Sequence, residues 1–352
     1  MLKNWAGAVS SVWKQNRTSV YWKMSVFRSE MDDVIAIVGK DLYTADVRET
    51  LTQFEQAKNF GSLIVPKLKD PAETARLIEA KNFSGDLLLN EVQERLVKML
   101  RMAEFLAPKY HVVVANPPYM GGKGMNGLLA KWLKDNYADV KSDLFSAFIV
   151  RNAQLTLPAG QLGFMTPFVW MFISSYEKLR EYILKQKTLT SLIQLEYSGF
   201  DGATVPICTF TMQNNYMPRF KGGYVKLSDF KGSKNQAPKT LEAIQNPDCG
   251  WFYRASAEDF GKIPGSPVAY WLSLDVLNCF SAGRLISDSC STRKGMATGL
   301  NAEFVRSWFE VSINNVGLGL SRQEAKEATM RWFPYANGGE YRKWYGNYED
   351  VV

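Results

Sequence analysis

Between residues 86 and 214 the chain alternates between helical and strand patterns, and few folds accommodate that order. Residues 86–107 (DLLLNEVQERLVKMLRMAEFLA) carry apolar side chains at helical spacing and stop before Pro108. The β-branched run 110–115 (YHVVVA) then predicts a buried parallel strand. Helices are also expected over 69–81, 143–157 and 174–187, and strands over 161–165, 191–197 and 208–214. Strands alternating with helices predict an α/β domain.

The composition changes after the last of these strands. The loop SGFDGATVPI before residues 208–214 is too short for a crossover helix, so the strands that it joins should be antiparallel neighbours. Residues 231–248 are polar, and the last hundred residues interleave Trp, Tyr and Phe with Arg and Lys. We expect four parts: a helical segment over 1–108, an α/β core over 109–217, a linker over 218–250 and a further domain over 251–352.

The residue counts exclude several kinds of chemistry. His111 is the only histidine among 352 residues, so a catalytic triad on any other histidine and a two-histidine zinc site are impossible. The four cysteines form no CxxC pair and are expected as free thiols in a reducing compartment. No apolar run is long enough to span a membrane. We therefore expect a soluble cytoplasmic protein without a metal site, and the net charge of +7 gives mild support for a polyanionic partner.

The tetrapeptide Asn116-Pro117-Pro118-Tyr119 follows the predicted strand 110–115 directly. In open α/β sheets, ligands bind beyond the carboxyl ends of strands. Two consecutive prolines fix two φ angles and remove two N–H donors, so the loop is stiff and offers carbonyl acceptors beside an amide and an aromatic ring. That combination suits an exocyclic amino group on a planar ring, such as adenine N6.

These residues resemble the catalytic motif of the DNA methyltransferases that modify adenine N6. The resemblance extends to Ser142-Asp143-Leu144-Phe145, to residues 160–167 (GQLGFMTP) and to Phe200-Asp201. It implies a catalytic role for Asn116, Pro117, Pro118 and Tyr119, with the Asn116 amide oxygen and the Pro117 carbonyl accepting hydrogen bonds from the adenine amino group. Tyr119 and Phe200 would stack on the two faces of a flipped-out base.

One branch of that family is more similar still. Residues 57–64 (AKNFGSLI), 294–304 (KGMATGLNAEF) and 331–347 (RWFPYANGGEYRKWYGN) resemble the adenine methyltransferases of bacterial BREX phage-defence systems, relatives of the type IIG restriction–modification enzymes. This implies the C-terminal part of a Rossmann-like S-adenosylmethionine-dependent methyltransferase domain, followed by part of a mixed α+β target-recognition domain over 251–352. Double-stranded DNA would be the partner, and the residues expected to contact it are Lys123, Lys294, Thr298, Asn301, Arg342 and Lys343.

The cofactor-binding part of the family pattern is missing. The family holds S-adenosylmethionine with a glycine-rich loop after its first strand, and no such loop precedes Asn116. Asn116 and Pro117 are expected to border the cofactor, whose other contacts stay unknown. Residues 122–127 (GKGMNG) fit GxGxxG formally but do not follow the strand directly. Two functions stay open: a methyltransferase that needs a missing N-terminal segment or other defence subunits, and an inactive DNA-binding or assembly subunit.

Overall fold

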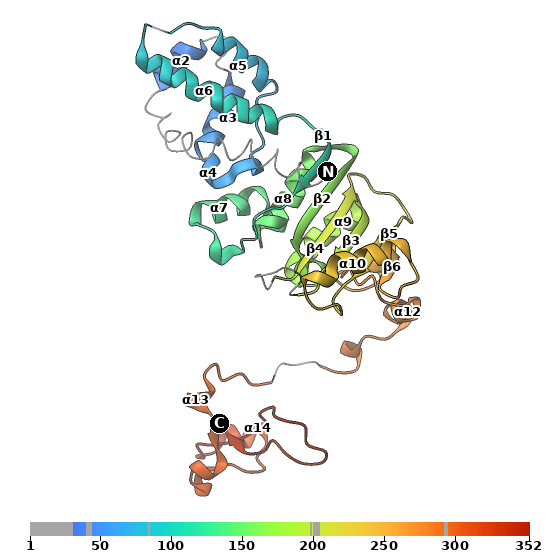
Figure 1. Cartoon of the computed structure of the whole chain (residues 1–352). Helices are drawn as coiled ribbons and strands as arrows, with labels where there is room; N and C mark the ends of the chain where they lie inside the picture. The colour runs from blue at the N-terminus through green and yellow to red at the C-terminus, as the bar shows by residue number, and fades with distance from the viewer. Residues whose placement is uncertain (1–30, 40–43, 84, 198, 200–204, 292–294) are drawn as a thin grey trace. The chain divides into compact units, whose positions relative to one another are not determined.

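The computed structural model of the chain describes residues 31–39, 44–83, 85–197, 199, 205–291 and 295–352 (Figure 1). The chain divides after Gly283 into two compact units. Within the described ranges, no helix combines the length and the hydrophobicity that a bilayer span requires. The first unit contains helices followed by a six-stranded sheet, and the candidate site lies in that sheet.

Helices come before the sheet in the described part of the first unit. They are α2 (Met31–Val38), α3 (Ala45–Glu55), α4 (Ala57–Phe60), the 3-10 turn η2 (Gly61–Leu63), α5 (Pro71–Glu79) and α6 (Leu87–Leu106). Asp70 begins α5 by accepting a hydrogen bond from the Glu73 N–H, and Asp86 caps α6 in the same manner. Both helices occupy the ranges that their apolar periodicity predicts, because each has a buried stripe and a capped start.

The sheet has the strand order β1-β2-β4-β3-β5-β6. Its strands are β1 (Tyr110–Ala115), β2 (Thr156–Pro167), β3 (Thr188–Gln194), β4 (Ile207–Gln213), β5 (Lys221–Lys226) and β6 (Phe252–Ser256). β1 runs parallel to β2 and β3 runs parallel to β5, whereas β4 is antiparallel to both β2 and β3. The expected α/β fold class and the antiparallel pairing of β3 with β4 are therefore confirmed.

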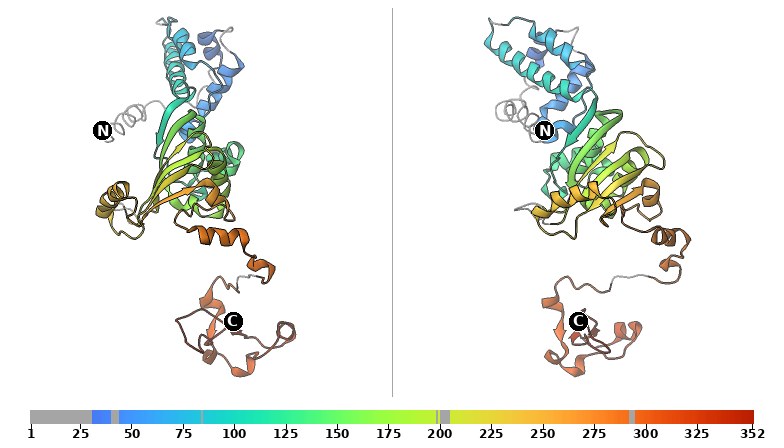
Figure 2. Two further views of the ribbon diagram at one scale, coloured as in Figure 1. Left: turned by 90° about the vertical axis from the view of Figure 1, so that its right-hand side faces the viewer. Right: turned by 45° about the vertical axis from the view of Figure 1, so that its right-hand side comes forward.

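Helices cover one face of this sheet along its length (Figure 2). α8 (Leu144–Gln154) and α9 (Glu177–Gln186) pack against Leu162, Phe164 and Phe210, which are at most 2% exposed. On the opposite face, α10 (Ser233–Gln245) covers β5 through Ala243 and Val225. The part of that opposite face formed by β1 is open to solvent in the described structure.

The exposure of β1 corrects one prediction. A run of three valines was expected to be buried, yet β1 is an edge strand, and Val112 and Val114 are 56% and 68% exposed. The predicted direction is right, because β1 pairs in parallel with β2. β2 also begins earlier than residue 161, since Ala159 adopts a φ of 61° beside a shift of register and lets the strand continue through Pro158.

The predicted linker over 218–250 is also wrong. β5 and α10 occupy this range, and β5 lies between β3 and β6 within the sheet. α10 is difficult to predict from the sequence because the range is polar and contains Pro238. A proline inside a helix removes one hydrogen bond and is therefore uncommon there. The boundary between the units lies after Gly283, beyond α11 (Ala257–Gly261) and α12 (Leu274–Ala282).

A buried arginine joins the N-terminal helices to the sheet. Arg151 on α8 is 2% exposed and donates to the carbonyls of Ser62, Ile64 and Leu106 at 3.2, 2.8 and 2.9 Å. α7 (Gly127–Asn136) joins the same region, because Trp132 stacks on Phe60 with ring centroids 4.4 Å apart. These contacts connect η2 and the end of α6 to α8, and they connect α4 to α7.

The second unit has little regular structure. Its longest helix is α14 (Arg322–Glu327), and it has a three-stranded sheet of β7 (Arg306–Ser307), β9 (Asp350–Val351) and β8 (Pro334–Tyr335). Large aromatic side chains are exposed along its surface, among them Tyr341 at 87% and Trp344 at 80%. The unit therefore presents a surface of rings and basic side chains and has a small core.

Candidate active site at the carboxyl edge of the sheet

The NPPY loop begins where β1 ends. Ala115 pairs with Phe164 of β2, so Asn116 follows the end of β1 beside Met165, which stays paired with Thr209 of β4. Pro117 is buried, whereas Asn116, Pro118 and Tyr119 are exposed. The structure thus brings the four predicted catalytic residues together at the edge where α/β sheets bind ligands.

The Tyr119 hydroxyl joins the loop to β2. It lies 3.0 Å from the Asn116 Oδ1 atom and 3.1 Å from the Met165 carbonyl oxygen, and it can donate to either. The Tyr119 ring meets the buried Phe145 ring edge-on, with centroids 6.4 Å apart, and keeps 37% of its surface exposed. Burial raises the pKa of Tyr119, so the hydroxyl keeps its proton and acts as a donor. The ring is held at its hydroxyl end and on one side, and the rest can receive a planar ligand.

The start of α8 supports the loop from the opposite side. Asp143 Oδ1 accepts hydrogen bonds from the Met120 N–H at 2.9 Å and the Phe145 N–H at 3.3 Å. Ser142 Oγ donates to the Ser175 carbonyl. The acidic–aromatic segment 142–145 therefore contacts the NPPY loop directly.

The last residue of β3 and the first residue of β4 lie at the same end of the sheet, the end where β1 and β2 have their carboxyl termini. β3 ends at Gln194 and β4 starts at Ile207, and the Leu195 N–H donates to the Ile207 carbonyl across the start of their loop. Phe200, the second predicted base-stacking residue, belongs to this loop but lies outside the described residues. The described ends of the loop are at the carboxyl edge that carries Asn116.

The predicted DNA contacts fall in both units. Lys123 is exposed in the short turn η3 (Gly122–Gly124) that follows the NPPY loop. The second unit holds Thr298, whose hydroxyl donates to Asn301 Oδ1, and the exposed pair Arg342 and Lys343. The Lys343 ammonium lies 5.3 Å from the centroid of the Trp344 ring. Lys294 lies outside the described residues.

The described residues do not fit a complete cofactor site. Every regular element described before β1 is a helix or a 3-10 turn, so the described residues contain no strand ahead of β1 that could carry a glycine-rich turn. Within the GxGxxG-like run 122–127, residues 122–124 form a 3-10 turn. Among the described residues at this end of the sheet, the groups present are the Asn116 amide, main-chain carbonyls and the Tyr119 ring.

Reasoning from sequence missed one group at this site. The Met165 carbonyl accepts a hydrogen bond from the Tyr119 hydroxyl. Every residue has a main-chain carbonyl, so the residue type at position 165 does not indicate this contact. The only sequence signal was the strand pattern of 161–165, which predicts that β2 ends near Asn116 if the two strands are neighbours.

Comparisons with known proteins add the following. Residues 17–200 match the family described as "Eco57I restriction-modification methylase". The chain is 35% identical over 327 residues to adenine-specific methyltransferase PglX of Lacticaseibacillus casei, covering 89% of this chain and 27% of PglX. It is 34% identical over 360 residues to adenine-specific methyltransferase BrxX of Escherichia coli, covering 98% of this chain and 28% of BrxX. The chain thus spans about a quarter of the length of these curated relatives.

A type I restriction-modification methyltransferase subunit from Streptococcus thermophilus has a solved structure with a weaker likeness. It is 16% identical, with a TM-score of 0.36, and the match covers 50% of this chain and 45% of that one. A score of this size supports no conclusion on its own.

Proposed function

The chain belongs to the Eco57I restriction-modification methylase family, and on that premise we propose that it forms the base-binding half of an adenine-N6 DNA methyltransferase active in phage defence. The observation that carries the proposal is the NPPY loop, in which the Asn116 amide oxygen and the Tyr119 ring meet at the carboxyl edge of the sheet. Two relatives are named adenine-specific methyltransferases, and this supports adenine as the base.

The groups at the site define what each residue contributes. Asn116 Oδ1 and the Pro117 carbonyl accept the two amino hydrogens of adenine, which holds the amino group in one orientation and directs its lone pair away from the protein acceptors. The Tyr119 ring stacks on the base, and stacking offsets part of the cost of removing the base from the duplex. S-adenosylmethionine supplies the methyl group. Because an amide, a carbonyl and a ring suffice for these roles, the chemistry needs no histidine.

The open edge of β1 supports a partner segment. Val112 and Val114 are largely exposed, and parallel strands are normally covered on both faces and paired on both sides. We infer that a methyltransferase segment carrying the glycine-rich strand-to-helix loop pairs with β1 and completes the cofactor site. The alternative is a DNA-binding or assembly subunit without catalysis, which the missing cofactor contacts in the described residues would favour.

A titration with S-adenosylmethionine separates these functions. With the chain alone, we expect no rise in melting temperature at millimolar cofactor. With a co-expressed segment that carries the glycine-rich loop, we expect a stabilisation of about 2.7 kcal/mol at a hundredfold excess over Kd. Stabilisation of the chain alone would contradict the need for a partner. No stabilisation in either sample would favour the inactive subunit. The same samples, incubated with DNA, are then assayed for N6-methyladenine by mass spectrometry.

Contact with DNA is proposed for the second unit, since bacterial cytoplasmic DNA is the substrate that the proposed reaction requires. Arg342 and Lys343 are exposed among rings such as Tyr341 and Trp344. Guanidinium and ammonium groups neutralise phosphates and release condensed counterions, so affinity falls as salt rises.

We expect the double substitution Arg342→Ala/Lys343→Ala to weaken binding to duplex DNA and flatten its salt dependence. If both side chains contact phosphates, the slope of log affinity against log salt should decrease by about 1.8, at about 0.9 for each contact. Fluorescence anisotropy over a salt series measures the slope. The matched control is Arg322→Ala/Lys326→Ala on α14, which removes the same charge from the same unit. An equal change in the control would show that only net charge matters.

A further inference from the structure

Asp143 is a half-buried carboxyl group that contacts the residue after the NPPY loop, and the base-binding roles above do not use it. Its residue forms an antiparallel bridge with Gly121, and the Leu144 N–H donates to the Met120 carbonyl at 3.0 Å. Asp143 Oδ1 accepts from the Met120 N–H at 2.9 Å. The main chain just after Tyr119 is therefore held by the start of α8 through both its N–H and its C=O groups.

These contacts go beyond the capping of α8. A carboxylate at this position ordinarily caps a helix by accepting N–H groups of its first turn. Here the bond to the first-turn N–H of Phe145 measures 3.3 Å, and the bond to the loop N–H of Met120 is shorter, at 2.9 Å. Burial raises the pKa of Asp143, while the N–H groups of Met120, Phe145 and Leu144 act against that rise. The Asp143 carboxylate is thus partly removed from water, and it makes a contact with Met120 that the capping of α8 does not require.

The placement of Met120 determines the placement of its neighbour Tyr119. The Tyr119 hydroxyl is fixed at Asn116 Oδ1 and the Met165 carbonyl, and its ring lies against Phe145 on α8. The loop is thus tied to β2 at the hydroxyl and to α8 at the next peptide group. If either of these contacts is lost, the Tyr119 ring and the Asn116 amide remain chemically unchanged. They would, however, no longer be held in a fixed orientation relative to each other.

We propose that Asp143 is a positioning residue that clamps the NPPY loop to α8 and so holds the Tyr119 ring and the Asn116 acceptor in register for an incoming base. The inference deepens the proposed function and rests on it for the identity of the ligand. The clamp itself is a property of the free chain and can be measured without cofactor or methylation.

The turn that follows the clamp contains a tryptic site. Lys123 is exposed in η3, which is closed by a hydrogen bond from the Gly124 N–H to the Gly121 carbonyl. Trypsin needs an extended chain, so the cleavage rate after Lys123 reports how often the loop opens. Digestion of the full chain under native conditions, with the Lys123–Gly124 cut followed by mass spectrometry, measures that opening.

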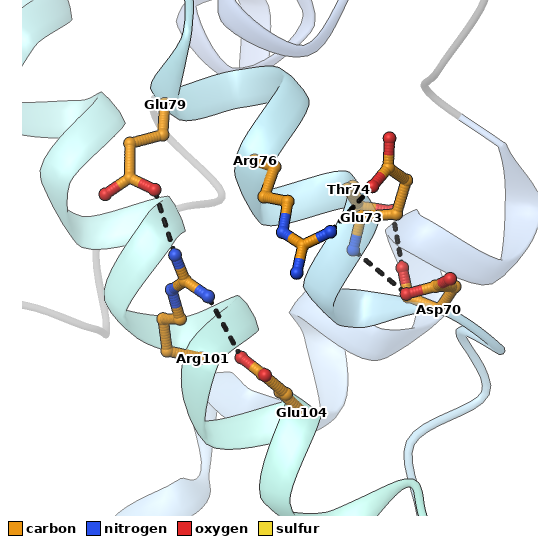
Figure 3. Close-up of polar contacts among 7 residues, drawn as sticks. All are labelled: Asp70, Glu73, Thr74, Arg76, Glu79, Arg101 and Glu104. Atoms are coloured by element: carbon orange, nitrogen blue, oxygen red, sulfur yellow. Dashed lines mark hydrogen bonds and ion pairs between the residues drawn. The ribbon is translucent and has the colours of Figure 1, made fainter.

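Asp143→Ala removes the acceptor and is expected to speed cleavage after Lys123 by about tenfold or more, because a charge-assisted hydrogen bond is lost. Asp143→Asn keeps an acceptor oxygen for both N–H groups and should restore protection close to the wild-type level. The matched control is Asp70→Ala, which removes the cap of α5 in the helical segment, where the carboxylate accepts a hydrogen bond from the Glu73 N–H at the start of its own helix (Figure 3). Asp70→Ala should leave cleavage after Lys123 unchanged.

Each contrary result overturns the clamp. Wild-type cleavage in Asp143→Ala would show that the loop is held without the carboxylate. Equal acceleration in Asp143→Asn would show that an acceptor oxygen is not what holds it, and equal acceleration in Asp70→Ala would point to a general loss of stability. In a methylating assembly, Asp143→Ala should lower kcat and leave the KM for DNA near its original value. Failure of methylation in the unsubstituted protein would count against the proposed function and leave the protease result intact.

Discussion

Replacement of Asn116 by alanine is expected to reduce formation of N6-methyladenine by about 100-fold or more, the usual cost of deleting one polar group that is preorganised at a reacting atom. The Asn116 amide is exposed at the end of β1, and its Oδ1 atom lies 3.0 Å from the Tyr119 hydroxyl. The substitution removes the proposed acceptor for the adenine amino group and, because Asn116 is exposed, creates no cavity in the core, so melting temperature and DNA affinity should change little. The measurement is the N6-methyladenine content of DNA after incubation with the methylating assembly.

Asn126→Ala is the matched control for this experiment. Asn126 is also an exposed amide; it caps α7 and donates to Asn59 Oδ1, and it belongs to neither the NPPY loop nor the end of β2. Methylation should stay near the wild-type level in this variant. Undiminished methylation in Asn116→Ala would remove the catalytic assignment, and an equal loss in both variants would indicate a damaged fold.

The largest expected loss of stability comes from Arg180→Met, at about 3 kcal/mol or more in the free energy of unfolding. Arg180 on α9 is 2% exposed, and its guanidinium donates to three carbonyl oxygens at 2.7 to 2.9 Å, those of Trp170, Ile173 and Gly265. A methionine fills similar space and leaves these acceptors without their donor. Burial lowers the pKa of Arg180, which reflects the same desolvation. Urea unfolding followed by tryptophan fluorescence measures the change.

Arg101→Met provides the comparison for that result. Arg101 on α6 lies at the surface, where it contacts Glu79 and Glu104 at 3.0 and 3.2 Å (Figure 3). Exposed ion pairs are screened by water and salt, so this substitution should shift the unfolding midpoint only slightly. If both substitutions lowered the free energy of unfolding by similar amounts, the contribution of Arg180 to stability would not come from its buried contacts with carbonyl groups.

Much of the fold could be predicted because its signals are local. The apolar stripe of α6 and the valine run of β1 show in short windows of sequence, and Pro117 and Pro118 mark the end of β1. The prediction that the valine run is buried was wrong, because the exposure of β1 depends on its position at the end of the described sheet and not on its own residues. α10 was not predicted, because Pro238 and the polar side chains of this range are typical of a loop.

The motif predicts the residues of the candidate site, but it does not predict most of the contacts between them. Asn116 and Tyr119 are identified by their motif, and their meeting with β2 follows from the parallel pairing. The bond between Asp143 and the Met120 N–H joins residues 23 positions apart, and no pattern in the sequence separates it from an ordinary helix cap. Contacts made by main-chain atoms depend on how the elements pack, so they required the structure.

The exposed valines of β1 have a consequence for how the chain behaves in a crowded cell. In the described sheet β1 is the end strand and pairs with β2, and the outer edge of such a strand can add a strand from an extended peptide, including another copy of this chain. The exposed side chains of Val112 and Val114 would then add apolar contacts that promote aggregation. If the proposed partner segment pairs with β1, we expect the chain to aggregate less when the two are produced together than when the chain is produced alone.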